Sequence, residues 1–123
     1  PVRIRRLGAV VGAAGLAELL WGLRSLGRNL TPGVEPLPAG ELVRTGAYAR
    51  VRHPIYLGLI LVLSGYALVW SNWRLALIAG WGALLFFEGK AKAEERHLEE
   101  RFTGYTKYCR QVPRLLPWGR PGL

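Results

Sequence analysis

The sequence predicts an all-α integral membrane protein, and the distribution of hydrophobic residues along the 123-residue chain carries this prediction. Half of the residues are hydrophobic, and the mean hydropathy is positive. They occur in blocks and are not spread over amphipathic segments, as is typical of membrane helices. The longest block, Ile55 to Trp73, has 19 residues without a formal charge. As a helix it would extend about 28 Å, close to the hydrocarbon thickness of a bilayer.

The first hydrophobic segment, residues 7–23, is expected to form the first membrane helix. Because arginines precede it and residues 12–15 are small, a signal peptide is the alternative. Glu18 is out of place in the hydrophobic region of a signal peptide, and this favours a spanning helix. Such an intramembrane carboxylate could have a functional role.

Residues 55–73 and 75–87 are predicted to form a hairpin of two membrane helices. The second has only 13 uncharged residues, but Arg74 and Glu88 at its ends can extend their charged groups to the two membrane surfaces. The tip, residues 70–73, reads Trp-Ser-Asn-Trp, which combines turn residues with the aromatic residues typical of a membrane interface.

The connection before this hairpin, residues 31–52, contains three prolines and is predicted to be extended. Residues 47–51 are expected to form a short turn at the interface, which must end at Pro54. Because Pro54 suits the first turn of a helix, we expect free backbone N–H groups beside Arg52 and His53. Such groups would suit an anion. The prolines are Pro32, Pro36 and Pro38.

After the hairpin, residues 90–108 are predicted to form a polar helix on the cytosolic side. Glu94, Leu98 and Phe102 recur every four residues, and Tyr105 follows after three more, so the four share one face. A carboxylate on an apolar face is unfavourable unless a cation meets it. The pattern therefore predicts that Glu94 has a cationic partner.

The basic residues predict the orientation of the chain in the membrane. Residues 24–54 carry five arginines and residues 88–123 carry eight lysines or arginines, whereas the hairpin tip has only Arg74. Both basic regions should therefore be cytosolic. The arginines within residues 3–6 then lie on the opposite side, unless another helix precedes them or the first segment is re-entrant.

The net charge of +9 suits anionic lipid headgroups. No nucleic-acid partner is expected, because the basic residues flank hydrophobic segments and no RNA-binding or helix-turn-helix pattern accompanies them. No metal site is expected either, since Cys109 is the only cysteine and His53 and His97 are far apart in sequence. The oligomeric state is not predicted.

Two motifs in the second half of the chain resemble a known family. The first runs from Thr45 to Gly58 and contains Arg-His-Pro-Ile-Tyr; the second follows the hairpin. Its residues are Glu94, Glu95, Arg96, His97, Leu98, Phe102, Tyr105, Tyr108, Val112, Pro113 and Arg114. Together and in this order, over residues 26–117, they resemble the isoprenylcysteine carboxyl methyltransferase and phospholipid methyltransferase superfamily of integral membrane enzymes.

The resemblance implies a single helical membrane domain that binds S-adenosylmethionine on the cytosolic side, between the two motifs. The residue types agree with this ligand. Arg52 and His53 suit its carboxylate, Glu94 suits its ammonium group, and tyrosine rings could face the sulfonium or stack on adenine. The implied cofactor-binding residues are Arg52, His53, Pro54, Tyr56, Gly58, Glu94, Glu95, Leu98, Tyr105 and Tyr108.

The chain departs from the family pattern at one point. The family usually has Phe-Gly-x-x-Tyr, whereas this chain has Phe102-Thr103-Gly104-Tyr105, which is one residue shorter. In a continuous helix, Tyr105 would be rotated by about 100° from its position in the family.

The acceptor is expected to be lipophilic, because membrane lipid surrounds such an enzyme. A carboxylate acceptor needs a cation to hold it, for which Arg110 and Arg114 are candidates, with Glu94 as a third catalytic residue. An isoprenylcysteine-like carboxylate is therefore the preferred acceptor. A phospholipid amine, which needs a base such as His53 or Glu94, is the alternative. A membrane protein without methyltransferase activity, such as a reductase-like relative, is another.

Simpler roles remain for several of these residues. His53 could be only a helix cap at the interface, and Glu94 and Glu95 could be solvated residues of a polar helix. Tyr48, Tyr56 and the tryptophans could anchor the chain at the membrane interface.

Overall fold

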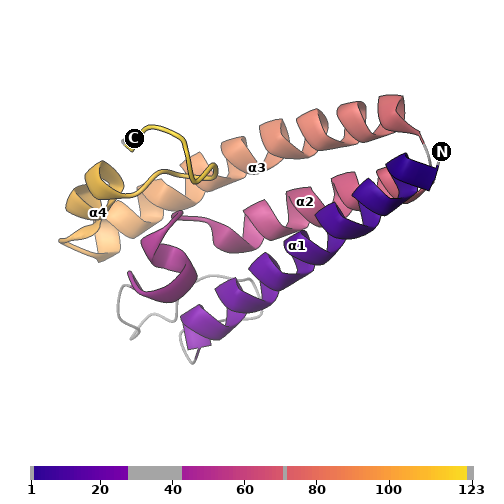
Figure 1. The fold of residues 1–123 in the computed structure, drawn as a ribbon. Helices are drawn as coiled ribbons and strands as arrows, with labels where there is room; N and C mark the ends of the chain where they lie inside the picture. The colour runs from indigo at the N-terminus through magenta and orange to yellow at the C-terminus, as the bar shows by residue number, and fades with distance from the viewer. Residues whose placement is uncertain (1, 28–42, 71, 122–123) are drawn as a thin grey trace.

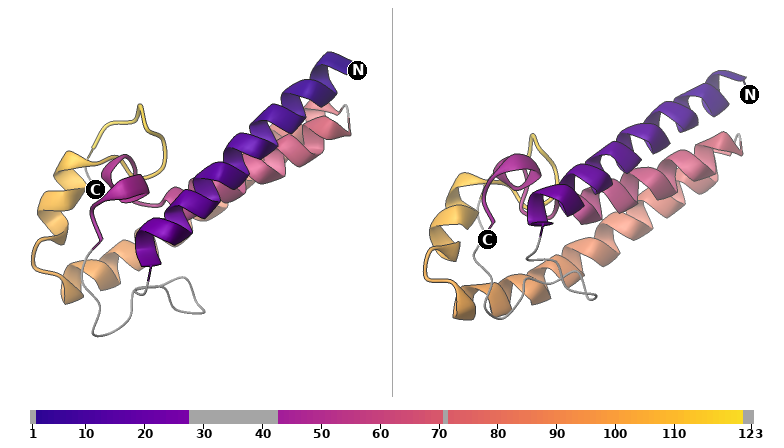
Figure 2. Two further views of the ribbon diagram at one scale, coloured as in Figure 1. Left: turned by 60° about the horizontal axis from the view of Figure 1, so that its bottom comes forward. Right: turned by 90° about the horizontal axis from the view of Figure 1, so that it is seen from below.

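A computed structural model describes residues 2–27, 43–70 and 72–121. These residues form four α-helices and one 3₁₀ helix, with no strand among them, which confirms the all-α prediction. The elements are α1 (Val2–Leu26), the 3₁₀ helix η2 (Gly46–Ala49), α2 (Pro54–Val69), α3 (Trp73–Arg101) and α4 (Tyr105–Gln111). The three long helices run side by side, with α2 between α1 and α3 (Figures 1 and 2). Both η2 and α4 lie at the end opposite the N-terminus.

Helix α1 is the one described helix that is long and apolar enough to cross a membrane. It is longer than the predicted segment 7–23, because the arginines before this segment are good helix formers and join the helix. It ends at Gly27, which has a φ of 56°, a conformation that glycine adopts without a steric penalty. Helix α2 is also apolar but has only 16 residues.

Glycines bring α1 and α2 into close contact. A Cβ atom on Gly65 of α2 would lie 2.4 Å from the backbone nitrogen of Gly12, and one on Gly15 would lie 2.6 Å from that of Val62. No side chain fits in this space, so the two backbones pack directly against each other. Gly58 belongs to the same interface, because its Cβ would lie 2.7 Å from the backbone nitrogen of Leu19.

The hairpin differs from the predicted segments 55–73 and 75–87. Helix α2 ends at Val69, and α3 begins at Trp73 because the Asn72 side chain caps it, accepting a hydrogen bond of 2.9 Å from the Leu75 N–H group. Trp73 therefore belongs to the second helix of the hairpin and not to the first.

The predicted separate helix 90–108 is also wrong in its bounds. Helix α3 continues without interruption from the hydrophobic hairpin to Arg101, and Gly89, which weakens a helix, does not break it. The break comes at Phe102, which is extended, and α4 starts afresh at Tyr105. The chain is thus not helical at residues 102–104, and the rotation expected for Tyr105 in a continuous helix does not apply.

The expected turn at residues 47–51 is the 3₁₀ helix η2. It is tied to the end of α1, because the Ala47 N–H group donates a hydrogen bond of 3.0 Å to the Ser25 hydroxyl. The proline-rich connection, with Pro32, Pro36 and Pro38, falls in residues 28–42 and lies outside the described residues.

Candidate functional site

The Arg52-His53 segment pairs with the C-terminal segment that follows α4. The Arg52 N–H group donates to the Pro113 carbonyl at 2.8 Å, and the His53 N–H group donates to the Arg114 carbonyl at 3.0 Å. The expectation of free N–H groups at these two residues is therefore wrong. Burial explains this, since an unpaired backbone N–H group would be unfavourable here and the returning chain supplies the acceptors.

The Arg52 side chain is buried, with 3% of the residue exposed. Its Nη1 atom donates to the carbonyls of Cys109 at 2.7 Å and Val112 at 3.0 Å, and its Nη2 atom donates to Glu95 Oε1 at 3.0 Å. Its Nε atom is buried without a hydrogen-bond partner among the described residues. One donor of this guanidinium is therefore left over for a ligand or water.

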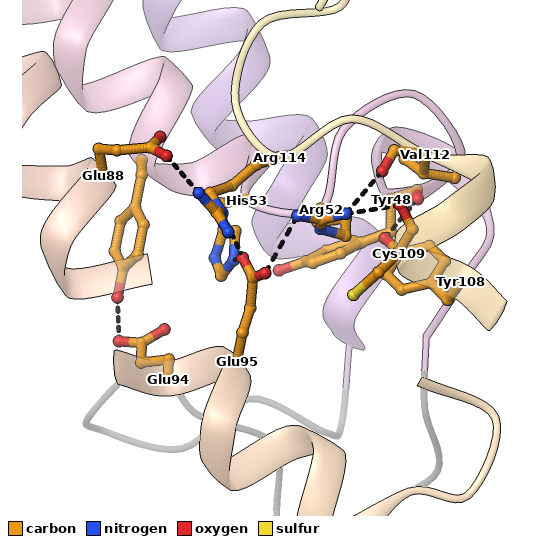
Figure 3. Close-up of polar contacts among 11 residues, drawn as sticks. Tyr48, Arg52, His53, Glu88, Glu94, Glu95, Tyr108, Cys109, Val112 and Arg114 are labelled. Carbon is orange, nitrogen blue, oxygen red and sulfur yellow. Dashed lines mark hydrogen bonds and ion pairs between the residues drawn. The ribbon is translucent and has the colours of Figure 1, made fainter. Parts of the chain in front are cut away.

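Glu95 is the carboxylate that meets the cations, in place of the predicted Glu94. Besides Arg52, its Oε2 atom lies 2.8 Å from His53 Nε2 and 2.9 Å from Arg114 Nε (Figure 3). Burial alone would raise the pKa of the Glu95 carboxyl, but these hydrogen bonds and charges outweigh it and lower the pKa. Glu95 therefore lies on the side of α3 that faces the motif and the C-terminal segment.

Arg114 joins Glu95 to a second carboxylate, because its Nη1 atom also pairs with Glu88. Burial alone would lower the pKa of Arg114, but its bonds to Glu95 and Glu88 raise it. The cluster thus contains two arginines, Arg52 and Arg114, and two carboxylates. Their formal charges cancel, as the burial of such groups requires.

Glu94 has a different environment. It directly precedes Glu95 on α3, is half-buried, and accepts a hydrogen bond from the Tyr56 hydroxyl. No ion pair within the described part of the chain includes Glu94. The Tyr56 ring stacks on His53, with centroids 5.4 Å apart, and on Phe87, with centroids 4.9 Å apart. Glu94 is therefore a carboxylate whose hydrogen-bond partner is a neutral hydroxyl.

A recess with two adjoining lobes lies between the end of α1, η2, the start of α2 and α3. The first lobe has about 400 Å³ of empty space, part of it open to solvent, and Glu94 and His53 are in its wall. The second has about 290 Å³ of empty space, part of it also open, and has tyrosines in its wall. The lobes share the residues Leu26, Tyr48, Arg52 and Leu98. Arg52, with its unpaired Nε atom, thus lies where the two lobes meet.

The second lobe is largely aromatic, and Arg52 is the charged residue in its wall. Tyr48, Tyr105 and Tyr108 line it, and the Tyr108 hydroxyl donates to the Tyr48 carbonyl at 2.6 Å. Burial raises the pKa of all three hydroxyls, so they stay protonated at neutral pH. Such a wall suits a flat aromatic ligand.

The structure brings most of the predicted site residues to this recess. Those that line it are Arg52, His53, Tyr56, Glu94, Leu98, Tyr105 and Tyr108. Glu95 lies behind Arg52 and His53, Pro54 is buried at the first turn of α2, and Gly58 packs against α1. Arg114 is bound to two carboxylates, and Arg110 is exposed on α4 away from the recess lining.

Sequence reasoning missed two residues of this region. Tyr48 lines both lobes but was not among the predicted site residues, because a role as a membrane anchor suited it equally well, although it lies inside the first motif. Glu88 was expected only to reach the membrane surface, and its pairing with Arg114 depends on the returning C-terminal segment, which no local pattern reveals.

The profile of the isoprenylcysteine carboxyl methyltransferase family matches residues 8–100, three quarters of the chain. The chain belongs to this family. The match includes Arg52, His53, Glu94 and Glu95.

The chain is also similar to the nickel-cobalt-cadmium resistance protein NccN of Alcaligenes xylosoxydans xylosoxydans. The two are 29% identical over 77 residues, which are 63% of this chain and 36% of NccN. The chain thus spans about a third of the length of this relative. No solved structure matches the chain significantly. Among the described residues, no group of three or more His, Cys, Asp or Glu side chains could hold a metal ion.

Proposed function

We propose that this chain is an S-adenosylmethionine-dependent methyltransferase that acts on a lipophilic acceptor. Family membership supports the reaction class, and the recess supports the cofactor. The observation that carries the proposal is Glu94, a carboxylate in the wall of the recess that no arginine or lysine among the described residues neutralises by an ion pair. A cationic ligand would supply the missing charge.

The residues present fit S-adenosylmethionine at each end of the recess. Glu94 would hold its ammonium group, and the positive charge of Arg52, whose side chain is fully buried behind the recess, would attract its carboxylate without a direct hydrogen bond. Tyr48, Tyr105 and Tyr108 would surround its adenine. Tyr56 is less suited to stacking on adenine, because His53 and Phe87 already stack on its ring. When bound, the cofactor supplies an electrophilic methyl group.

The chain's own residues would then orient the two reactants, because methyl transfer from a sulfonium mainly requires alignment. The His53–Glu95–Arg114 cluster holds the wall of the recess in place. We propose a carboxylate acceptor of the isoprenylcysteine type, since Arg114 is a half-buried cation that binds the same Glu95 oxygen as His53 in this wall. Arg110 is exposed, and we propose no contact with the acceptor for it.

We further propose that α1, α2 and the first half of α3 span the membrane, with the recess on the cytosolic side. Exposed large hydrophobic residues on all three helices support this, for example Val10, Tyr66 and Ile78. The recess lies at the end of the bundle next to the basic regions, which the positive-inside rule places in the cytosol.

Calorimetry with S-adenosylhomocysteine tests the cofactor proposal on the detergent-solubilised protein. Glu94→Gln keeps the shape of the side chain but removes its charge, so affinity should fall by about 1.5 to 3 kcal/mol. Glu99→Gln is the matched control, because Glu99 is an exposed residue of the same helix. Equal affinity in the protein and in Glu94→Gln would refute the assignment, and binding of NADPH instead would favour a reductase-like protein.

The acceptor is tested by incubating membranes with S-adenosylmethionine labelled on its methyl group and either of two acceptors. A farnesylated cysteine analogue should give a methyl ester that releases labelled methanol in alkali, and its carboxamide should be inert. Phosphatidylethanolamine would instead give a methylamine that is stable to alkali. Label only in stable lipid would show that the acceptor is an amine.

A further inference from the structure

Arg44 links the segment before η2 to the start of α4. Its Nη2 atom donates a hydrogen bond of 2.9 Å to the Gly104 carbonyl, although 60 residues separate the two in sequence. The same carbonyl accepts a hydrogen bond of 3.1 Å from the Tyr108 N–H group. The Arg44 guanidinium also lies over the Tyr108 ring, 6.0 Å from its centroid. A hydrogen bond and a cation–π contact therefore connect Arg44 to the first turn of α4.

Gly104 leaves the space that the Arg44 side chain occupies. A Cβ atom at position 104 would overlap the Arg44 Nη2 atom. The backbone itself does not require glycine here, because its φ of −89° is one that other residues also adopt. Gly104 is also the residue at which the chain departs from the Phe-Gly-x-x-Tyr pattern of its family. The shifted glycine thus makes room for Arg44.

This link lies outside the second lobe of the recess and joins two parts of its wall. Val43 and Tyr108 line the lobe, whereas Arg44 and Gly104 do not. Val43 directly precedes Arg44, and Tyr108 is the residue over whose ring the guanidinium lies. The Tyr108 hydroxyl also donates to the Tyr48 carbonyl, so α4 is connected to both ends of the segment that leads into η2 (Figure 3).

We propose that Arg44 is a positioning residue that closes the second lobe on its ligand. Its bond to Gly104 holds Val43 in the wall, opposite to any opening of the segment before η2. This inference rests on the proposed function, which places adenine in the lobe. Arg44 lines neither lobe, so it acts through Val43 and Tyr108 and does not contact the ligand. A lobe that is held closed favours binding, because fewer groups have to be ordered by the ligand.

The Arg44 link can open while the rest of the wall stays in place. Arg44 is exposed, and its bond to Gly104 lies at the surface, so water can replace either partner. Helix α4 is held independently, because the buried Arg52 side chain donates to two carbonyls at its C-terminal end. The 3₁₀ helix η2 is tied to α1 through the Ala47 N–H group. Val43 is therefore the part of the wall that the link controls.

Calorimetry with S-adenosylhomocysteine and with 5′-methylthioadenosine, on the detergent-solubilised protein, tests this proposal. Arg44→Ala should weaken binding of both ligands about fivefold, the low end of typical coupling between two sites. The losses should be equal, because methylthioadenosine keeps the adenine but lacks the ammonium and carboxylate groups. Arg50→Ala removes the same side chain at another exposed position next to η2 and should have no effect.

Gly104→Ala breaks the link without changing Arg44. Its Cβ atom would displace the guanidinium, so this variant should also weaken binding about fivefold. When combined with Arg44→Ala it should bring no further loss, since the link is already absent. Gly89→Ala is the matched control, because its Cβ atom would meet nothing within 4 Å. Arg44→Lys keeps a donor for the carbonyl and should recover part of the affinity.

Three results would overturn the proposal. They are unchanged methylthioadenosine affinity in Arg44→Ala, losses that add in the double variant, and a loss in Arg44→Ala that is confined to S-adenosylhomocysteine and thus reflects charge. Thermal unfolding of each variant shows whether the fold is retained, and a surface link should leave the melting temperature nearly unchanged. Glu94→Gln separates the two proposals. Weaker binding in Glu94→Gln with full affinity in Arg44→Ala would refute the role of Arg44 alone, whereas an unmodified protein that binds neither ligand would refute the proposed function itself.

Discussion

His53 Nε2 and Glu95 Oε2 lie 2.8 Å apart, although 42 residues separate them in the sequence. The same oxygen binds Arg114, so one carboxylate on α3 connects the start of α2 to the C-terminal segment. The backbone of this segment also pairs with Arg52 and His53. Side-chain and main-chain hydrogen bonds therefore hold together the start of α2, α3 and the C-terminal segment. This junction forms the wall of the recess.

Replacing Glu95 should therefore destabilise the fold. Glu95→Gln would leave Arg52 buried without a counter-ion, and breaking a buried ion pair typically costs about 3 to 5 kcal/mol. Thermal unfolding in detergent, followed by circular dichroism, measures the effect. Glu99→Gln on the exposed face should change stability by less than about 0.5 kcal/mol. Equal melting temperatures for Glu95→Gln and the unmodified protein would contradict a structural role.

The contribution of Glu95 should depend on pH with a defined sign. Its pKa in the folded protein is lower than the usual value of 4.5. A carboxyl with a lowered pKa stabilises the fold at pH values above its unfolded pKa, and this stabilisation is lost as the pH falls through the folded pKa. The stability difference between the unmodified protein and Glu95→Gln should thus be constant above about pH 5 and shrink below pH 4. Melting curves from pH 3 to pH 8 measure it, and a difference that grows on acidification would contradict the assignment.

The positions of the helices were easier to predict from the sequence than the geometry of the site. Long uncharged runs predicted the hairpin, because hydrophobic blocks reflect local composition. The end of α2 and the continuity of α3 were not predicted, since they depend on the Asn72 cap and on a helix that tolerates Gly89. Bounds of this kind are set by single contacts and not by periodicity.

The site was predicted as a set of residues but not as a geometry. Both motifs do converge on one recess. Helical periodicity placed Glu94 among the cations because it shares a face with Leu98, yet Glu95 meets them. The reason is that the cations come from Arg52 and from a C-terminal segment that folds back along α3, and periodicity within one helix carries no information about either.

The glycines of α1 and α2 also give a prediction. Gly65→Ala would place a Cβ atom 2.4 Å from the backbone nitrogen of Gly12, so the helices must separate. We expect a loss of about 1 to 3 kcal/mol, as for other overpacked interfaces. Gly82→Ala is the matched control on α3, because its Cβ would meet nothing within 4 Å, and it should be neutral or slightly stabilising. Thermal unfolding in detergent compares the two, and equal melting temperatures for Gly65→Ala and Gly82→Ala would contradict close packing at Gly65.

The orientation in the membrane can be tested with single cysteines. Thirteen of the seventeen basic residues lie in residues 24–54 and 88–123, so the positive-inside rule predicts that the hairpin tip faces outward and the tail faces the cytosol. Native Cys109 gives little background, because it is fully buried and burial raises the pKa of its thiol. In intact cells, a membrane-impermeant maleimide should label Arg74→Cys, an exposed position near the tip, and should label Lys107→Cys on α4 only after permeabilisation. The unmodified protein is the control. Labelling of Lys107→Cys in intact cells with Arg74→Cys protected would reverse the orientation and would place the recess outside the cytosol, where S-adenosylmethionine could not reach it from the cytosolic pool.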